Sequence, residues 1–276
     1  MNSKTKAMHN NNHILLVVVY KLRLIVSPTL QSIANYLQVQ DSQTVASYQL
    51  FIWDNSPSPS YADADILRVQ IPMLEIQYVH TPENRSLSRI YNNVASKLVD
   101  HEYLTLLDQD TVLSPAYFEE LKMAQQEQWP LILPKVECQS LLVSPGKRFF
   151  AKGIRLKEIN SGVVNSKNLL AINSGMSILG KVFQSIQYDE RLRFYGTDTY
   201  FMRNYEKYFN QAFVLDTPIS HSLAVMERRS EDWRIAYIEE LMRTFDIIYT
   251  NSIWELLFIR TYLIFIRLKH LTRHCN

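Results

Sequence analysis

The sequence predicts an α/β fold built on a mixed, mostly parallel sheet that is flanked by helices. Short apolar segments rich in β-branched residues alternate with segments whose apolar residues recur at helical spacing. This alternation is typical of parallel sheets covered by helices. The apolar segments end in polar residues, and the carboxyl ends of parallel strands meet along the crevice where ligands bind.

The first half of the chain contains four predicted strands, at 14–20, 48–53, 74–79 and 103–107. Three helices are predicted between and after them. Ser27 and Ser114 are expected to cap two of these helices, each with a proline at the first helical position. Ser86 is expected to cap the third, which should run to about Leu98.

The second half is more irregular. Strands are predicted at 131–137, 149–156, 169–173 and 213–215, and a helix follows Gly196-Thr197-Asp198. Two further helices are predicted at 231–249 and 252–274. Gly175, one of only six glycines, indicates either a special backbone conformation with a close ligand approach or a simple turn.

Composition and length limit the possible classes of protein. The 276 residues, 47% of them apolar, allow one large α/β domain at 14–225, a polar, disordered lead at 1–13 and a helical segment at 226–276. The lead lacks the apolar core of a signal peptide, and no uncharged apolar span of 20 residues occurs. A net charge of +2 gives no case for nucleic-acid binding. Cys138 and Cys275 offer neither a disulfide framework nor a metal cluster, which fits a reduced, cytoplasmic environment.

The most informative motif is Asp108-Gln109-Asp110, which ends the strand predicted at 103–107. Carboxylate oxygens are the ligands that Mg²⁺ and Mn²⁺ prefer, and substrate phosphates complete such sites. The alternative is a strand-to-turn junction with solvated acids. Asp54 and Asn84 follow two other strands, so we expect these polar residues to share one crevice.

Several motifs in order resemble the family 2 inverting glycosyltransferases of GT-A fold. The resemblance covers about residues 14–225. The motifs that carry it are Val17-Val18-Val19-Tyr20, Asp54-Asn55-Ser56, Asn84, Leu106-Leu107-Asp108-Gln109-Asp110-Thr111, Asn173-Ser174-Gly175, Tyr195-Gly196-Thr197-Asp198 and His221-Ser222. It implies a nucleotide-sugar half at 14–113 and an acceptor half at 114–225.

The resemblance also implies roles for individual residues. The residues expected to contact the nucleotide-sugar donor are Asp54, Asn84, Arg85, Arg89, Asp108, Gln109 and Gly175. Asp110 would bind Mn²⁺ or Mg²⁺ and His221 would be a second ligand or a supporting partner, while Asp198 would be the catalytic base. The alternatives are a turn-capping Asp54, surface charges at Arg85 and Arg89, and a structural His221.

The Asp-Gln-Asp form is similar to the bacterial rhamnosyltransferase branch, which uses dTDP-L-rhamnose to build O-antigen or capsular polysaccharide. The acceptor would be a hydroxyl of a glycan or lipid-linked glycan. Many relatives carry Glu-Asp where this chain has Thr197-Asp198, but one carboxylate suffices as a base. The Gln-x-x-Arg-Trp motif of processive synthases is missing from the sequence, which favours transfer of one sugar per encounter.

Three other functions compete with this interpretation. A transferase of the same class could use a UDP-sugar, and a degenerate domain could bind a nucleotide sugar as a scaffold at the membrane. A nucleotidyltransferase is disfavoured because 20–27 contains no glycine for a phosphate-binding loop.

The helix predicted at 252–274 is unusually apolar. Arg260 and Arg267 lie one heptad apart, and Lys269 and Arg273 add positive charge. The pattern fits a helix peripheral to the inner face of the plasma membrane, attracted by anionic lipid, and it fits equally a helix that packs in a core or a dimer.

Overall fold

The computed structural model describes residues 13–221 and 231–272, and the side chains of these ranges except those at 231, 232, 234 and 266–272. Several features of the sequence therefore lie outside the described residues or side chains. They are the lead at 1–12, Ser222, the start of the helical segment at 226–230, Arg267, Lys269, Arg273 and Cys275.

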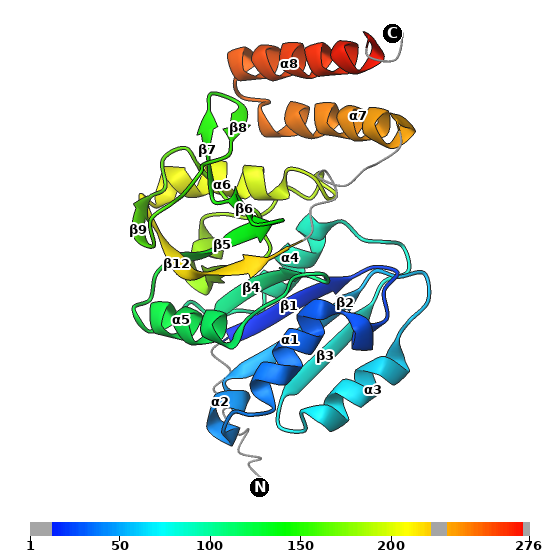
Figure 1. The fold of residues 1–276 in the computed structure, drawn as a ribbon, viewed down its shortest axis with the longest axis vertical. Helices are drawn as coiled ribbons and strands as arrows, with labels where there is room; N and C mark the ends of the chain where they lie inside the picture. The colour runs from blue at the N-terminus through cyan, green and yellow to red at the C-terminus, as the bar shows by residue number, and fades with distance from the viewer. Residues whose placement is uncertain (1–12, 222–230, 273–276) are drawn as a thin grey trace, which may run out of the picture.

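A nine-stranded mixed sheet forms the centre of the molecule (Figure 1). Its strands lie in the order β3-β2-β1-β4-β11-β5-β12-β9, and β6 pairs with β5. The strands are β1 (His13–Val19), β2 (Tyr48–Asp54), β3 (Glu75–His80), β4 (Tyr103–Asp108), β5 (Leu131–Cys138), β6 (Leu141–Ser144), β9 (Gly162–Asn165), β11 (Met176–Leu179) and β12 (Gln211–Ser220). The first four strands are parallel, and β12 is parallel to β5. This arrangement confirms the predicted fold class.

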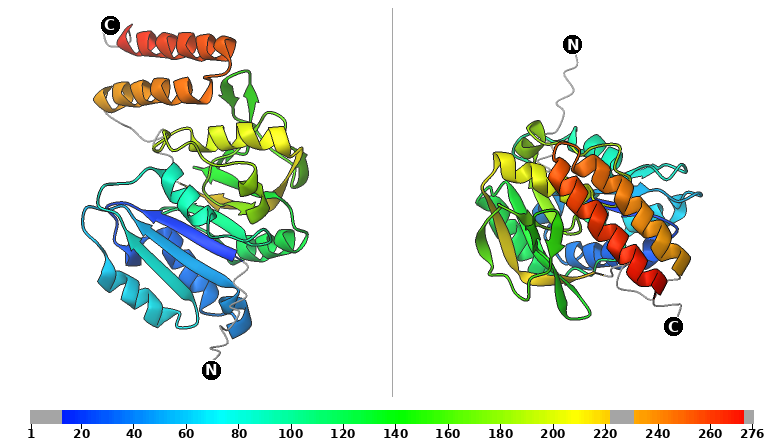
Figure 2. Two further views of the ribbon diagram at one scale, coloured as in Figure 1. Left: turned by 180° about the vertical axis from the view of Figure 1, so that it is seen from behind. Right: turned by 90° about the horizontal axis from the view of Figure 1, so that it is seen from above.

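Helices cover both faces of the sheet (Figures 1 and 2). They are α1 (Pro28–Leu37), α2 (Ser42–Ala46), α3 (Tyr61–Gln70), α4 (Leu87–Ala95), α5 (Pro115–Gln126) and α6 (Thr197–Tyr208), with short 3₁₀ turns η1 (Leu24–Val26) and η2 (Gly180–Gln184). The predicted caps are confirmed, because Ser27, Ser86 and Ser114 each accept a hydrogen bond from a first-turn amide.

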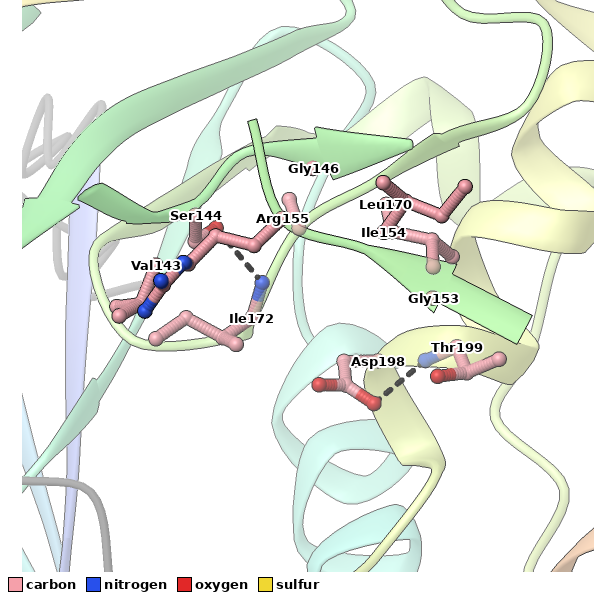
Figure 3. Close-up of a pocket in the computed structure, with 11 residues that line it drawn as sticks. Val143, Ser144, Gly146, Gly153, Ile154, Arg155, Leu170, Ile172, Asp198 and Thr199 are labelled. Carbon is pink, nitrogen blue, oxygen red and sulfur yellow. Dashed lines mark hydrogen bonds between the residues drawn. The ribbon is translucent and has the colours of Figure 1, made fainter. Parts of the chain in front are cut away.

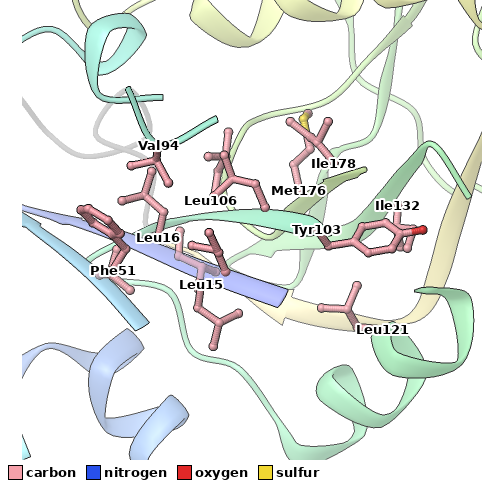
Figure 4. Close-up of a cluster of buried hydrophobic side chains, with 14 of the residues drawn as sticks. Leu15, Leu16, Phe51, Val94, Tyr103, Leu106, Leu121, Ile132, Met176 and Ile178 are labelled. Carbon is pink, nitrogen blue, oxygen red and sulfur yellow. The ribbon is translucent and has the colours of Figure 1, made fainter. Parts of the chain in front are cut away.

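The core lies on both faces of the sheet because successive strand residues point to opposite sides. Leu15 and Leu16 of β1 do so, and Figure 4 shows Leu16 toward Val94 of α4 and Leu15 on the side of Leu121 of α5. All four side chains are fully buried. Burial on both sides explains why this strand reads as a continuous apolar run.

Several predictions need correction. The strand expected at 149–156 is a hairpin of β7 (Gly146–Phe149) and β8 (Lys152–Ile154), because Phe150 adopts φ +54° and turns the chain. This hairpin and β10 (Leu169–Leu170), shorter than predicted, form a separate three-stranded sheet. Helix α3, in the first half of the chain, and strand β11 were not predicted.

Two C-terminal helices, α7 (Glu231–Ile248) and α8 (Ile253–Thr272), stack above the sheet domain (Figure 1). They share a second hydrophobic cluster with the hairpin and α6, which includes Ala151, Leu192, Ile248, Tyr249, Ile259 and Leu263. Within the described ranges, no helix is long and apolar enough to cross a bilayer.

Candidate active site

The Asp108-Gln109-Asp110 turn is held by the start of α1. The Thr29 hydroxyl donates to the carbonyl oxygen of Asp108, and the Ser27 hydroxyl donates to that of Gln109 at 2.6 Å. The Gln109 side chain accepts a hydrogen bond from the Tyr20 amide at 2.8 Å. Gln109 therefore fixes the turn to the end of β1, and the carboxylates on either side are left to project from the edge of the sheet.

His221 lies against both carboxylates of this turn. Its Nε2 is 3.6 Å from Asp108 Oδ2, and its Nδ1 is 3.4 Å from Asp110 Oδ1. The Thr111 hydroxyl holds the ring through a contact of 3.1 Å to Nδ1. The sequence alone left the place of His221 open, and the structure joins it to the Asp pair because Val112 bridges to Ser220 at the end of β12.

These three side chains offer the oxygen and imidazole donors that suit a hard or borderline divalent ion. The imidazole currently turns different nitrogen atoms toward the two acids. Among the residues described, no set of three His, Cys, Asp or Glu side chains is arranged to hold a metal ion as it stands. The donor chemistry of Asp110 and His221 fits such an ion.

Asp108 is strained electrostatically. Burial against the surrounding protein raises the pKa of Asp108 above the usual range, although 39% of its side chain is exposed. The imidazole of His221 lowers the pKa, and the charge of Asp110 raises it again. A cation at this position would relieve the repulsion between the two acids.

Asp198 lies in the first turn of α6, directly after Gly196 and Thr197. Its Oδ1 accepts a hydrogen bond of 2.6 Å from the Thr199 amide. Burial raises the pKa of Asp198, and the charge of Asp108 adds to the increase. The charge of Asp108 can act on Asp198 only over a short distance, so the fold brings Asp198 near the Asp-Gln-Asp turn.

Two buried tyrosines pack beside the acids. The pKa of Tyr91 is raised chiefly by burial and also by the charges of Asp108 and Asp198, and that of Tyr188 by burial and Asp198. The two rings lie 5.0 Å apart. Neither tyrosine belongs to a sequence motif, and only the fold brings α4 next to the segment before α6.

A cavity of about 190 Å³ opens beside Asp198 (Figure 3). Asp198 and Thr199 line one end of it, and Val143, Arg155 and Ile172 line the other. The lining between comes from the β7–β8 hairpin. Arg155 belongs to no sequence motif, and the β7–β8 hairpin brings it to this cavity.

The segment Asn173-Ser174-Gly175 supports both acid clusters. Asn173 donates to the Thr197 hydroxyl at 2.9 Å, and the Ser174 hydroxyl accepts from the Asp108 amide at 3.3 Å. Gly175 has φ +80°, so the special backbone conformation considered for it is present. An added Cβ there would lie 2.6 Å from Ile219 and 2.7 Å from Pro134, so the close neighbours of Gly175 are protein side chains.

Asp54, by contrast, has the hydrogen bonds of a turn-capping residue. It is fully buried, and its two oxygens accept from the Ser56 amide at 2.9 Å and from the Tyr78 hydroxyl at 2.6 Å. These bonds shape the turn after β2. Because Asp54 is fully buried, a contact of its carboxylate with the donor would require the turn to open.

Asn84, Arg85 and Arg89 meet in a second cavity, of about 340 Å³, at the start of α4. Arg193, which the sequence analysis did not select, completes the basic lining and donates to the carbonyl oxygen of Asn84 at 3.2 Å. Arg85 and Arg89 form exposed ion pairs with Glu83 and Glu190, at 2.7 and 3.2 Å. Exposed pairs of this kind contribute little stability and exchange readily for an anionic ligand.

No protein-family model and none of the curated proteins match this sequence. Solved structures match the fold. The *Staphylococcus aureus* protein TarS (residues 1–349, with UDP-GlcNAc) is 14% identical, with a TM-score of 0.62 over 87% of this chain and 66% of that one. GalNAc-T7 with UDP, GalNAc and Mn²⁺ is 9% identical, with a TM-score of 0.61 over 88% and 48%.

The mannosyltransferase PcManGT from *Pyrobaculum calidifontis*, with GDP-Man and Mn²⁺, is 12% identical, with a TM-score of 0.54 over 93% and 70%. The chain spans 64% of the TarS 1–349 structure and 39% of a longer TarS structure. At these identities the comparisons show the fold, which is the GT-A fold.

Proposed function

We propose that the chain is an inverting glycosyltransferase that moves a sugar from a nucleotide donor to a hydroxyl group. The observation that carries the proposal is the nearness of Asp198 to the cluster of Asp108, Asp110 and His221, since the charge of Asp108 raises the pKa of Asp198 and His221 lies against both other acids. One acid would act on the acceptor, and the cluster would bind the diphosphate side of the donor. The shared fold with structures that hold UDP-GlcNAc and GDP-Man supports a nucleotide sugar as the donor.

Asp198 is the proposed catalytic base. It would take the proton from the acceptor hydroxyl while the hydroxyl oxygen attacks the anomeric carbon and the bond from that carbon to the nucleoside diphosphate breaks. Burial raises the pKa of Asp198 and so makes its carboxylate a stronger base. Arg155, at the far end of the cavity, would contact the acceptor.

Asp110 and His221 would hold Mn²⁺ or Mg²⁺, with Asp108 near the ribose or the sugar. The ion would stabilise the negative charge of the departing diphosphate as a Lewis acid. The Arg85, Arg89 and Arg193 cavity supplies further positive charge for the donor. Gln109 and Gly175 would then affect donor binding by fixing the conformation of the backbone around Asp108. Asp54 would contact the nucleotide only if the turn after β2 opens.

The donor that we favour is dTDP-L-rhamnose, which the Asp-Gln-Asp motif supports, for O-antigen or capsule assembly in the cytoplasm at the plasma membrane. A UDP-sugar is the second candidate, because TarS and GalNAc-T7 are found with UDP-GlcNAc and UDP. A thermal-shift panel of nucleotide sugars separates the two, since a bound donor raises the apparent stability.

We also propose a division of the chain by task. Residues 14–113 would bind the nucleotide sugar, residues 114–225 would bind the acceptor, and 226–276 would be an added helical segment. The cavity beside Asp198 supports this division, because its lining comes from residues 143–199.

The decisive experiment is Asp198→Asn, with Asp65→Asn on the exposed face of α3 as the matched control. Turnover should fall about 10²–10⁴-fold in the first variant while donor affinity is kept. The control should keep both. Normal kcat in Asp198→Asn would exclude this residue as the base.

A second experiment tests donor binding by calorimetry with dTDP and with UDP, each with and without Mn²⁺. Asp110→Ala should lose the part of the affinity that depends on the metal. If the unaltered chain binds neither nucleotide and releases none from its sugar, the transferase proposal fails and a scaffold replaces it.

A further inference from the structure

An exposed apolar surface joins α8 to the β7–β8 hairpin. We call it the docking surface, and it consists of Phe149, Phe150, Ile154, Ile253, Trp254, Leu257, Phe258, Ile264 and Phe265. Trp254 is 73% exposed, Phe149 67% and Phe265 61%. Isolated exposed apolar residues need no explanation, but a contiguous group of this size marks an interaction site.

The two parts of the docking surface are held together by contacts. The rings of Phe150 and Phe258 meet edge to face, with centroids 5.3 Å apart. The Tyr249 hydroxyl donates to the carbonyl oxygen of Ala151 at 3.0 Å. Arg148 of β7 donates to Glu255 of α8 at 3.0 Å. The hairpin and the start of α8 also lie side by side in both ribbon views (Figures 1 and 2).

Positive charge borders this surface, and two carboxylates near it, Glu255 and Asp246, are paired with arginines. The Lys152 ammonium lies 4.7 Å from the ring centroid of Tyr262, and Arg155 is exposed one residue beyond β8. Glu255 is buried between Arg148 and Arg203, and Asp246 is paired with Arg260 at 2.6 Å. Apolar and aromatic side chains flanked by Lys and Arg are the composition of surfaces that lie on anionic bilayers.

We propose that the docking surface binds the surface of an anionic lipid bilayer. The apolar side chains would enter the boundary between headgroups and acyl chains, where Trp254 suits the interface. Lys152 and Arg155 would meet the lipid phosphates and carboxylates. The charge complementarity favours lipid over a second copy of this chain, which would bring the same cations face to face.

The docking surface also reaches the cavity beside Asp198. Ile154 belongs to both, and Arg155 lines the cavity two residues beyond Gly153 (Figure 3). This part of the inference rests on the proposed function. It assigns the acceptor to the class of membrane-borne glycans, whose lipid stays in the bilayer while a hydroxyl reaches Asp198.

Vesicle sedimentation with the full chain tests the docking surface without any need for activity. The probes are vesicles of phosphatidylcholine alone and of phosphatidylcholine mixed with phosphatidylglycerol. The double variant Trp254→Ser/Leu257→Ser should lower partition onto the mixed vesicles about tenfold or more. Lys152→Gln should lower it about fivefold, and this loss should vanish in high salt.

Two exposed apolar residues elsewhere provide the matched control. Val69 on α3 and Met123 on α5 are 80% and 60% exposed, so Val69→Ser/Met123→Ser removes comparable apolar area outside the docking surface. This variant should bind vesicles as the unaltered chain does. Equal binding by both double variants would overturn the proposal.

The outcomes separate this inference from the proposed function. A chain that binds dTDP or UDP but neither kind of vesicle refutes the docking surface and leaves the transferase intact. A chain that binds vesicles but no nucleotide does the reverse. A dimer in sedimentation equilibrium that Trp254→Ser/Leu257→Ser converts to monomer, with no vesicle binding, would assign the surface to a second copy instead.

Discussion

The substitution Gly196→Ala, which replaces one hydrogen atom of the loop before α6 with a methyl group, should lower both the stability of the chain and its turnover. Gly196 has φ +74° and directly precedes the turn that carries Asp198. An added Cβ would lie 2.8 Å from Ile248 Cδ1 and closer still to Thr244 Cγ2. Both contacts come from α7, so the C-terminal helices press directly on the loop that positions the proposed base.

The magnitude follows from two costs. A left-handed conformation costs an alanine roughly 1–2 kcal/mol, and forcing a methyl into packed side chains costs about 1–3 kcal/mol more. Gly162→Ala provides the matched control, because Gly162 has φ +90° but an added Cβ would meet nothing within 4 Å. We therefore expect a loss of about 2–5 kcal/mol for Gly196→Ala and of roughly 1–2 kcal/mol for the control.

Urea unfolding of the two variants measures these losses, and donor turnover measures the effect on the site. Turnover should fall in Gly196→Ala, since either α7 or the start of α6 must shift, and should be unchanged in Gly162→Ala. Equal losses of stability in the two variants would refute the packing of α7 on this loop. A strongly destabilised Gly196→Ala with full turnover would show that the loop does not position Asp198.

Three further predictions concern charge and hydrogen bonding. Asp198→Asn should be more stable than the unaltered chain at neutral pH. The pKa of Asp198 is raised in the folded state, so its contribution to stability is fully present below the unfolded pKa of about 3.9 and is lost as the pH rises through the folded pKa. The advantage of the variant should therefore vanish in thermal scans near pH 3. Thr29→Val leaves buried backbone groups of the turn at Asp108 without a partner, so urea unfolding should show a loss of about 1–3 kcal/mol and calorimetry a weaker donor affinity. Glu255→Gln removes the negative charge that pairs with Arg203 at 2.8 and 2.9 Å, which should lower the free energy of unfolding by about 3 kcal/mol. The variant should also expose α8 to limited proteolysis. An unchanged cleavage pattern would contradict the role of this ion pair in holding α8.

The local rules of sequence predicted much of the first half. The four parallel strands appear within a residue or so of their predicted positions. Strands β1, β2 and β4 are buried on both faces and read as apolar runs, whereas β3 lies at the edge of the sheet and is only partly buried. The serine caps at Ser27, Ser86 and Ser114 follow from hydrogen bonds within one turn of the chain. Such interactions are complete within a few residues, so the sequence alone can specify them.

Elements that depend on distant partners were harder to predict. Strand β11 has four residues, and it forms because Met176 pairs with Leu106 and Ser177 pairs with Ile132. The hairpin at 146–154 was taken as one strand, since nothing local signals a turn at Phe150. Helix α3 has weak apolar periodicity and starts without a side-chain cap, so it lacked both signals on which helix prediction depends.

The sequence by itself determined which residue types are available at the strand ends, and with them the two acids of the turn and the acid after Gly196. The tertiary structure alone decided that the charge of Asp108 acts on the pKa of Asp198, 90 positions away in the chain, and that His221 lies between the acids of the turn. It also decided that Asp54 is buried in the turn after β2, that Arg155 lines the cavity beside Asp198 and that Arg193 lines the cavity at the start of α4. The physical reason is that electrostatic coupling and burial depend on distance through space, which sheet order and helix packing set and which spacing along the chain does not record.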